Sequence, residues 1–181
     1  MGPGNAECQS FLMAGTRKKT ARSYGRVKKR RREKMAEFIM LTGDESKGKT
    51  STLHFVHEIL VTKGGKITAM KNEGGPKYRD FFDVVEYNNK KIAIFTAGDC
   101  FDHVLKAFSN CETNKADFLI CACNNVLKNH KRLEKVFENK INNIEKTHSL
   151  DLQSMIAANW YDAWKIIEKL EDCLKVDLAK G

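Results

Sequence analysis

The segment FIMLTGDESKGKTSTLHFVHEIL, residues 38–60, decides the expected fold of this chain. It opens with a short apolar run that is closed by Gly43, a pattern typical of a buried strand. From Lys49 onward, apolar residues recur at spacings of three and four, which predicts a helix that ends near Gly64. The segment therefore predicts a strand, a glycine-containing turn and a helix in immediate succession.

The centre of the segment, GDESKGKT, fits the pattern G-x-x-x-x-G-K-[ST] at Gly43, Gly48, Lys49 and Thr50. Glycines let a backbone fold around phosphates, and the positive end of the following helix favours an anion. We expect Lys49 to reach the β- and γ-phosphates and the Thr50 hydroxyl to join a Mg²⁺ shell. The predicted nucleotide-binding residues are Gly43, Asp44, Glu45, Ser46, Lys47, Gly48, Lys49, Thr50 and Ser51.

Strands and helices are expected to alternate along the remaining chain. Strands are predicted at 67–70, at 118–123, more weakly at 140–146, and in a hairpin over 81–95 that turns at the two asparagines 88 and 89. Helices are predicted at 101–109, 131–138 and 159–174. This order predicts an α/β fold of three layers, mostly a parallel sheet with an antiparallel hairpin edge.

With this motif and this α/β order over residues 37–174, the chain resembles the P-loop NTPase superfamily. The resemblance implies a P-loop NTPase fold and a second site that supplies an acid for the metal or the attacking water. Asp99, just past the strand that ends at Phe95, is the candidate catalytic and metal-binding acid. The superfamily places Asp directly after the strand, where this chain has Thr96. Either Asp99 reaches back, or Thr96 holds a metal-bound water, or Asp99 only caps the next helix.

The glycine-rich, charged segment from Lys71 to Asp80 is predicted to be a loop. It could close over the phosphates as a lid, with Arg79 as a catalytic residue that stabilises transferred charge, or it could be surface charge. Arg132 is a weaker candidate of the same kind.

NKAD at residues 114–117 has the letters of a guanine-reading motif, but it precedes a strand instead of following one. ATP is therefore expected in preference to GTP. By resemblance to the superfamily, base contacts are expected after Cys123 or near Lys146 and Thr147.

The cysteines and several aromatic residues are interpreted as structural. None of the six cysteines forms a C-x-x-C pair, and Cys121 and Cys123 alternate in an apolar run, which favours buried, reduced thiols and a cytoplasmic setting. His54 and His57 share one helix face without a third ligand and are interpreted as helix-surface residues. The two tryptophans of the last helix are predicted to lie in the core.

Charge divides the chain at Met35. Residues 1–34 hold eleven Lys and Arg against two Glu, a balance of +9 that equals the net charge of the whole chain. This segment is expected to be a basic disordered tail, a nucleic-acid-binding arm confined to residues 17–34, or a translated leader, because RREKM can be encoded as a ribosome-binding sequence ahead of a start codon. Residues 35–181 are expected to form one nucleotide-binding domain without a membrane span.

These patterns predict Mg²⁺-dependent binding and hydrolysis of a nucleoside triphosphate, with ATP favoured. A small-molecule or nucleotide kinase is an alternative, which the presence of only Arg79 and Arg132 in residues 35–181 disfavours. A nucleotide-dependent nucleic-acid-binding module is a second alternative and requires the basic tail. The sequence does not identify a protein partner.

Overall fold

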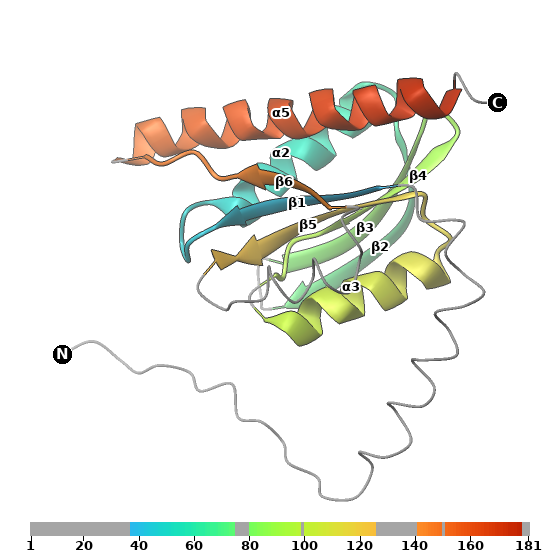
Figure 1. Ribbon diagram of the computed structural model, residues 1–181, viewed down its shortest axis with the longest axis horizontal. Helices are drawn as coiled ribbons and strands as arrows, with labels where there is room; N and C mark the ends of the chain where they lie inside the picture. The colour runs from blue at the N-terminus through green and yellow to red at the C-terminus, as the bar shows by residue number, and fades with distance from the viewer. Residues whose placement is uncertain (1–36, 75–79, 99, 126–140, 150, 179–181) are drawn as a thin grey trace, which may run out of the picture. The chain divides into compact units, whose positions relative to one another are not determined.

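The computed structural model describes residues 37–74, 80–98, 100–125, 141–149 and 151–178, and these form a mixed sheet covered by helices (Figure 1). The sheet has six strands in the order β2-β3-β4-β5-β1-β6. The strands are β1 (Glu37–Gly43), β2 (Lys66–Gly74), β3 (Asp80–Tyr87), β4 (Lys90–Phe95), β5 (Phe118–Asn124) and β6 (Ile141–Glu145). The helices of the described residues are α2 (Lys49–Thr62), α3 (Phe101–Thr113) and α5 (Leu152–Leu178). The predicted α/β class is confirmed.

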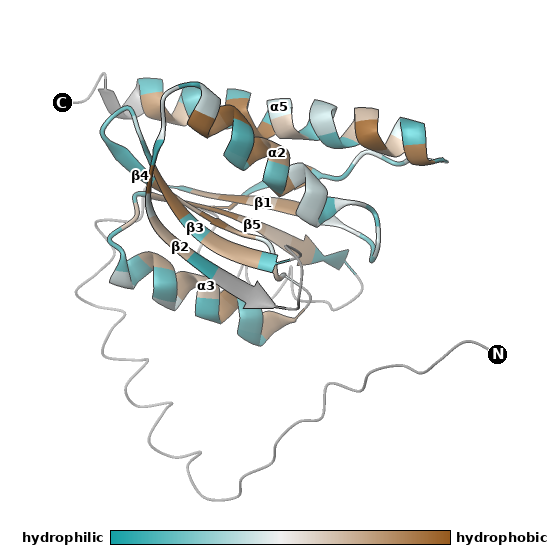
Figure 2. Cartoon of the chain, turned by 180° about the vertical axis from the view of Figure 1, so that it is seen from behind, coloured by the Kyte–Doolittle hydropathy of each residue, from teal (hydrophilic) through white to brown (hydrophobic). Residues whose placement is uncertain are grey.

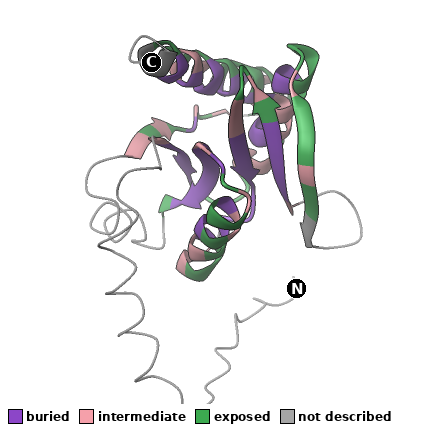
Figure 3. Ribbon diagram, turned by 90° about the vertical axis from the view of Figure 1, so that its right-hand side faces the viewer, coloured by how far each residue is buried: buried purple, intermediate pink, exposed green. Residues whose placement is uncertain are grey.

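The helices lie on both faces of the sheet. Helices α2 and α5 cover one face and α3 covers the other, with the most hydrophobic ribbon segments between them (Figures 1 and 2). Side chains alternate across β1, so that Ile39 and Leu41 pack with α2 and α5, whereas Phe38 and Met40 pack with α3. The central strands are buried on both faces (Figure 3), which explains their continuous apolar sequences.

Strand direction brings several chain segments to one edge of the sheet. β1 is parallel to β5 and β6, and β4 is parallel to β5, so their carboxyl ends share that edge. β3 is antiparallel to β4, so its first residue, Asp80, lies at the same edge. The predicted hairpin between β3 and β4 is confirmed, and Asn88 and Asn89 both adopt the positive φ that its tight turn requires, 51° and 59°.

Four predicted boundaries are wrong. Helices α3 and α5 each end four residues later than predicted, at Thr113 and Leu178. β2 continues to Gly74, so the first part of the predicted loop from Lys71 to Asp80 is a strand that pairs with β3. The last helix begins at Leu152, well before residue 159. The proposed lid residue Arg79, together with Arg132 and its predicted helix, lies outside the described residues.

The interpretation of His54 and His57 as surface residues is wrong. Both are half-buried, and their ring centroids lie 4.7 Å and 5.7 Å from that of Phe81, because this side of α2 faces β3. Nε2 of His57 lies 3.2 Å from Oδ2 of the buried Asp83. Burial lowers the pKa of His57 and raises the pKa of Asp83.

The tryptophans of α5 are not core residues. Trp160 and Trp164 are 38% and 44% exposed, whereas Ile167 and Leu170 of the same helix are buried. Trp160 instead stacks on Phe55 of α2 with ring centroids 4.1 Å apart. The indoles therefore cover the outside of the contact between α2 and α5.

Four of the five described cysteines agree with the expectation of buried thiols, whereas Cys100 is half-buried. Cys111, Cys121, Cys123 and Cys173 are buried, and Cys121 and Cys123 pack in the same cluster beneath α3. Burial raises the pKa of Cys111 to about 12, and burial with a hydrogen bond to Glu37 does the same for Cys173. None of the described helices combines the length and apolar character that crossing a bilayer demands.

Candidate phosphate-binding site

The loop between β1 and α2 has the backbone geometry of a tight turn at the carboxyl edge of the sheet. Ser46 and Gly48 have positive φ values of 59° and 84°. Gly48 is the N-cap residue of α2, and its carbonyl accepts the first helical hydrogen bond, from Thr52 N–H at 2.9 Å. Glycine has no side chain to cap the helix, and a helix N-terminus attracts anions.

Lys49 folds back over this loop instead of extending into solvent. Its Nζ donates hydrogen bonds to the carbonyl oxygens of Gly43 at 3.0 Å and Asp44 at 2.6 Å. The residue is only 7% exposed. The ammonium group is thus held at the mouth of the loop by backbone carbonyls.

The other predicted loop residues surround this ammonium group with different exposure. Gly43 is buried, Lys47, Gly48 and Thr50 are half-buried, and the remaining loop positions are exposed (Asp44, Glu45, Ser46 and Ser51). The structure therefore brings the whole predicted set together on one turn and the first turn of α2.

Helix α5 and the segment after β6 form walls that require glycine in the loop. A Cβ atom on Gly48 would lie 2.5 Å from Oδ1 of Asn159, and a Cβ on Gly43 would lie 2.7 Å from Cβ of Lys146. The same Oδ1 of Asn159 accepts a hydrogen bond from Thr52 Oγ1 at 3.2 Å. Asn159 therefore fixes α5 against the start of α2.

A buried ion pair holds the segment after β6. Nζ of Lys146 lies 2.7 Å from Oδ2 of Asp162 on α5, and their side chains are 1% and 0% exposed. Asp162 also accepts hydrogen bonds from the Thr147 N–H at 2.8 Å and the Thr147 hydroxyl at 2.6 Å. Burial alone would raise the pKa of Asp162, but the hydrogen bonds and charge of its partners lower it overall. Lys146 and Thr147, where base contacts were expected, thus use their polar groups to anchor α5.

Asp80 is an acid from outside the motif that contacts it, and it is not among the residues predicted from the sequence. Its Oδ1 accepts hydrogen bonds from Thr50 Oγ1 at 3.5 Å and from Thr96 Oγ1 at 3.0 Å. The Thr96 hydroxyl in turn accepts the N–H of Phe81 at 2.8 Å. Thr96 therefore positions Asp80, a role that differs from the predicted capture of a metal-bound water. The sequence could have indicated this contact, because Asp80 stands at the start of a strand that is antiparallel to the strand ending at Phe95.

Asp99, the predicted acid, lies outside the described residues. The strand before it, β4, is separated from β1 by β5, so it is not the neighbour of the loop-bearing strand. Gly98 crosses β5 so closely that a Cβ would lie 1.6 Å from the carbonyl oxygen of Ala122. Asn124, at the end of β5, donates its N–H to the Gly98 carbonyl at 3.2 Å and lies beside Gly43 in register.

The NKAD segment lies at the opposite edge of the sheet from the loop. Asp117 precedes β5 and accepts a hydrogen bond from the N–H of Lys91, the second residue of β4, at 3.0 Å. The amino ends of β4 and β5 lie at one edge of the sheet, and the loop at residues 43–51 lies at the other. A nucleotide with its phosphates at that loop could not place its base against Asp117. The structure therefore agrees with the exclusion of a guanine-reading role for this motif.

Thr50 and Asp80 are suited to provide two oxygen ligands to a magnesium ion whose coordination shell is completed by phosphates. Within the described ranges there is no group of three His, Cys, Asp or Glu that could hold a metal by itself. Mg²⁺ typically takes one or two protein oxygens plus water and substrate phosphates, with ligands at about 2.1 Å. Adjacent octahedral ligands then lie about 3.0 Å apart, and the oxygens of Thr50 and Asp80 are 3.5 Å apart. The Thr50 and Asp80 oxygens would therefore fit one Mg²⁺ shell after a small movement towards each other.

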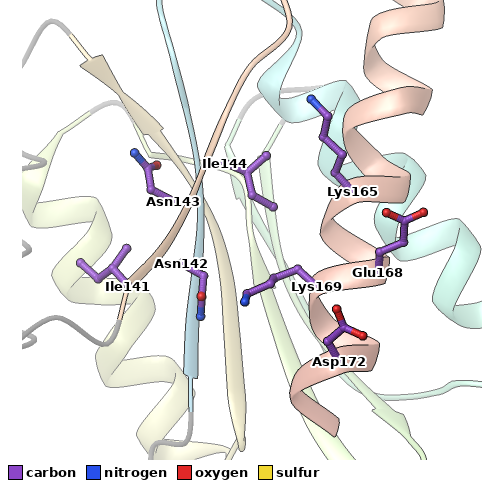
Figure 4. A pocket seen from close by; sticks show the side chains of 8 residues that line it. All are labelled: Ile141, Asn142, Asn143, Ile144, Lys165, Glu168, Lys169 and Asp172. Atoms are coloured by element: carbon purple, nitrogen blue, oxygen red, sulfur yellow. The ribbon is translucent and has the colours of Figure 1, made fainter. Parts of the chain in front are cut away.

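A shallow groove of about 500 Å³ between β6 and α5 does not overlap this site (Figure 4). Polar and charged side chains line most of it: Asn142 and Asn143 on β6, and Lys165, Glu168, Lys169 and Asp172 on α5. It contains none of the residues 43–51 and is not used in the function considered below.

Comparison with protein-family models, with curated proteins and with solved structures gave no match. The site is therefore interpreted from its own geometry.

Proposed function

We propose that this chain binds a nucleoside triphosphate together with Mg²⁺ and hydrolyses its terminal phosphoanhydride bond, as a small member of the P-loop NTPase superfamily. The observation that carries the proposal is the position of Lys49. Its ammonium group lies over the Gly43–Asp44 turn, directly before the uncapped start of α2. A buried cation beside the N-terminus of a helix favours a polyanion.

The residues of the loop would share the work of binding. The β- and γ-phosphates would lie against the first turn of α2, with Lys49 exchanging its loop carbonyls for phosphate oxygens. Thr50 and Asp80 would hold Mg²⁺, which supplies charge neutralisation at the phosphate oxygens. Thr96 would keep the Asp80 carboxylate oriented by donating to its Oδ1.

Asp80 separates this proposal from simple anion binding. A site that only attracts phosphate should gain affinity when a nearby carboxylate is neutralised, since like charges repel. A Mg²⁺-dependent site should instead lose affinity and turnover, because it loses a metal ligand.

The test is phosphate release from ATP and GTP by the full chain over a Mg²⁺ titration, comparing Asp80→Asn with Asp172→Asn. Asp172 is an exposed carboxylate on α5 that pairs with Lys175, and serves as the matched control. We expect Asp80→Asn to lower turnover at least about tenfold, consistent with the loss of a metal-coordinating group, and to raise the Mg²⁺ concentration needed. Unchanged turnover and Mg²⁺ dependence in Asp80→Asn would exclude the metal role of Asp80.

A further inference from the structure

The inner side of α5 continues past the sheet as an exposed apolar surface. Leu152 and Ile156 are 68% and 48% exposed. Because 18 residues make about five helical turns, Leu152 lies on the same side of the helix as Leu170, and Ile156 lies on the same side as Leu174. Leu170 and Leu174 are buried against the sheet. The same side of one helix is thus buried over its later turns and exposed over its first two.

Asn159 relates this exposed part to the phosphate-binding loop. It lies beside Gly48 and accepts the hydrogen bond of Thr52, so it marks where α5 passes the loop. At 1.5 Å per residue, Ile156 lies about 5 Å and Leu152 about 10 Å farther along the helix axis. The first turns of α5 extend beyond the tips of β1 and β5 (Figure 1). Leu152 is also two turns from Asn159, on nearly the same side.

We propose that Leu152 and Ile156 form the nucleobase contact of the bound nucleotide. This inference rests on the proposed function, since it requires the triphosphate to occupy residues 43–50. A nucleoside attached to that triphosphate must leave the loop past its walls, and the α5 wall presents aliphatic side chains in that space. Burying them against a base removes apolar surface from water.

The chemistry of the contact sets the class of substrate. Aliphatic side chains touch the face of a base, whereas discrimination between bases depends on hydrogen bonds to their edges. Every base has such a face. The site therefore takes nucleoside triphosphates with little preference between adenine and guanine, and binds ATP and GTP within about tenfold of each other.

The experiment compares three ligands: ATP, GTP and inorganic triphosphate, each titrated with Mg²⁺ into the full chain by calorimetry. The test variant carries Leu152→Ser and Ile156→Ser, and the control carries Val61→Ser and Ile67→Ser, two other exposed aliphatic residues. Because all four positions are exposed, the melting temperatures should stay close to that of the parent. We expect the test variant to bind ATP and GTP about tenfold more weakly, with unchanged binding of inorganic triphosphate and an unchanged control.

The other outcomes each overturn the inference. If the parent binds ATP and inorganic triphosphate but the test variant binds both as well as the parent does, the base contact is elsewhere and the proposed function stands. Equal weakening of all three ligands, or a parent chain that prefers one purine by far more than tenfold, also overturns it. If the parent binds none of the three ligands, both the inference and the proposed function fail. If light scattering shows a dimer that only the test variant loses, with nucleotide affinity intact, these residues instead contact a second copy.

Discussion

Replacing Asp162 by Asn should be the most destabilising polar substitution among the described residues near the site. Asp162 is fully buried and holds Lys146 at 2.7 Å and Thr147 through two hydrogen bonds. The substitution leaves the Lys146 ammonium buried without a countercharge. Removing one partner of a buried pair costs about 3–5 kcal/mol, a large share of the roughly 5–15 kcal/mol that stabilises a typical domain.

Urea unfolding of the parent and of Asp162→Asn measures this loss directly. Lys165→Gln is the control, because Lys165 also contacts Asp162, at 3.2 Å, but its side chain is 35% exposed, and such a pair contributes at most about 1 kcal/mol. A loss of less than about 1 kcal/mol in Asp162→Asn would refute the reasoning. A double variant, Lys146→Met with Asp162→Leu, should recover much of the loss, because it removes both charges.

The same pair predicts a pH dependence with a definite sign. The pKa of Asp162 is lowered in the folded protein, so the unfolded chain binds its proton more readily. The stabilisation is therefore complete above the ordinary value of 3.8 and is lost as the pH falls below it towards the folded pKa. The unfolding free energy of Asp162→Asn should consequently fall less steeply with acid than that of the parent.

Three further substitutions or measurements test the rest of the site. Gly48→Ala should lower the melting temperature and weaken nucleotide binding, because the new methyl group would meet Asn159. Gly64→Ala is the control, because Gly64 has a similar positive φ but lies in open space. It should show the backbone strain alone, about 1 kcal/mol. Thr96→Val should raise the Mg²⁺ concentration needed for turnover, as measured by phosphate release. It should also lower the unfolding free energy by about 1–3 kcal/mol, as measured by thermal melting, because the Phe81 N–H loses its acceptor. Disulfide-exchange reagents should modify Cys111 and Cys121 only upon unfolding, because burial raises both pKa values; fast labelling of either in the folded chain, followed by mass spectrometry of peptides, would contradict this.

Local patterns predicted the elements well where the physics is local. The apolar run of β1 and the asparagine turn at residues 88 and 89 each depend on neighbouring residues alone, and their predictions are confirmed. The length of β2 could not be read in the same way, because pairing with β3 extends it through the polar residues Lys71 and Asn72. Pairing across a sheet overrides the local preference for a loop.

The site was predicted only in part for the same reason. Lys49 and Thr50 follow from a contiguous motif, but Asp80 reaches Thr50 through the order and direction of β3 and β4. Similarly, Lys146 looked available for a base, and only the packing of α5 brings Asp162 to it. The exposure of Trp160 and Trp164 depends on how α5 is rotated over α2. Helical periodicity does not determine this rotation when both sides of the helix carry apolar residues.

Calorimetric titration of Mg²⁺ and ATP into the full chain, comparing the parent with Lys49→Met, tests the central claim most directly. Lys47→Met, which removes another cation of the same loop, is the control, and thermal melting monitors folding of both variants. We expect saturable binding by the parent and by Lys47→Met, with loss of detectable binding in Lys49→Met, because only the Lys49 ammonium folds over the loop. A folded Lys49→Met variant that binds ATP as tightly as the parent would contradict the assignment of residues 43–50 as a phosphate-binding loop.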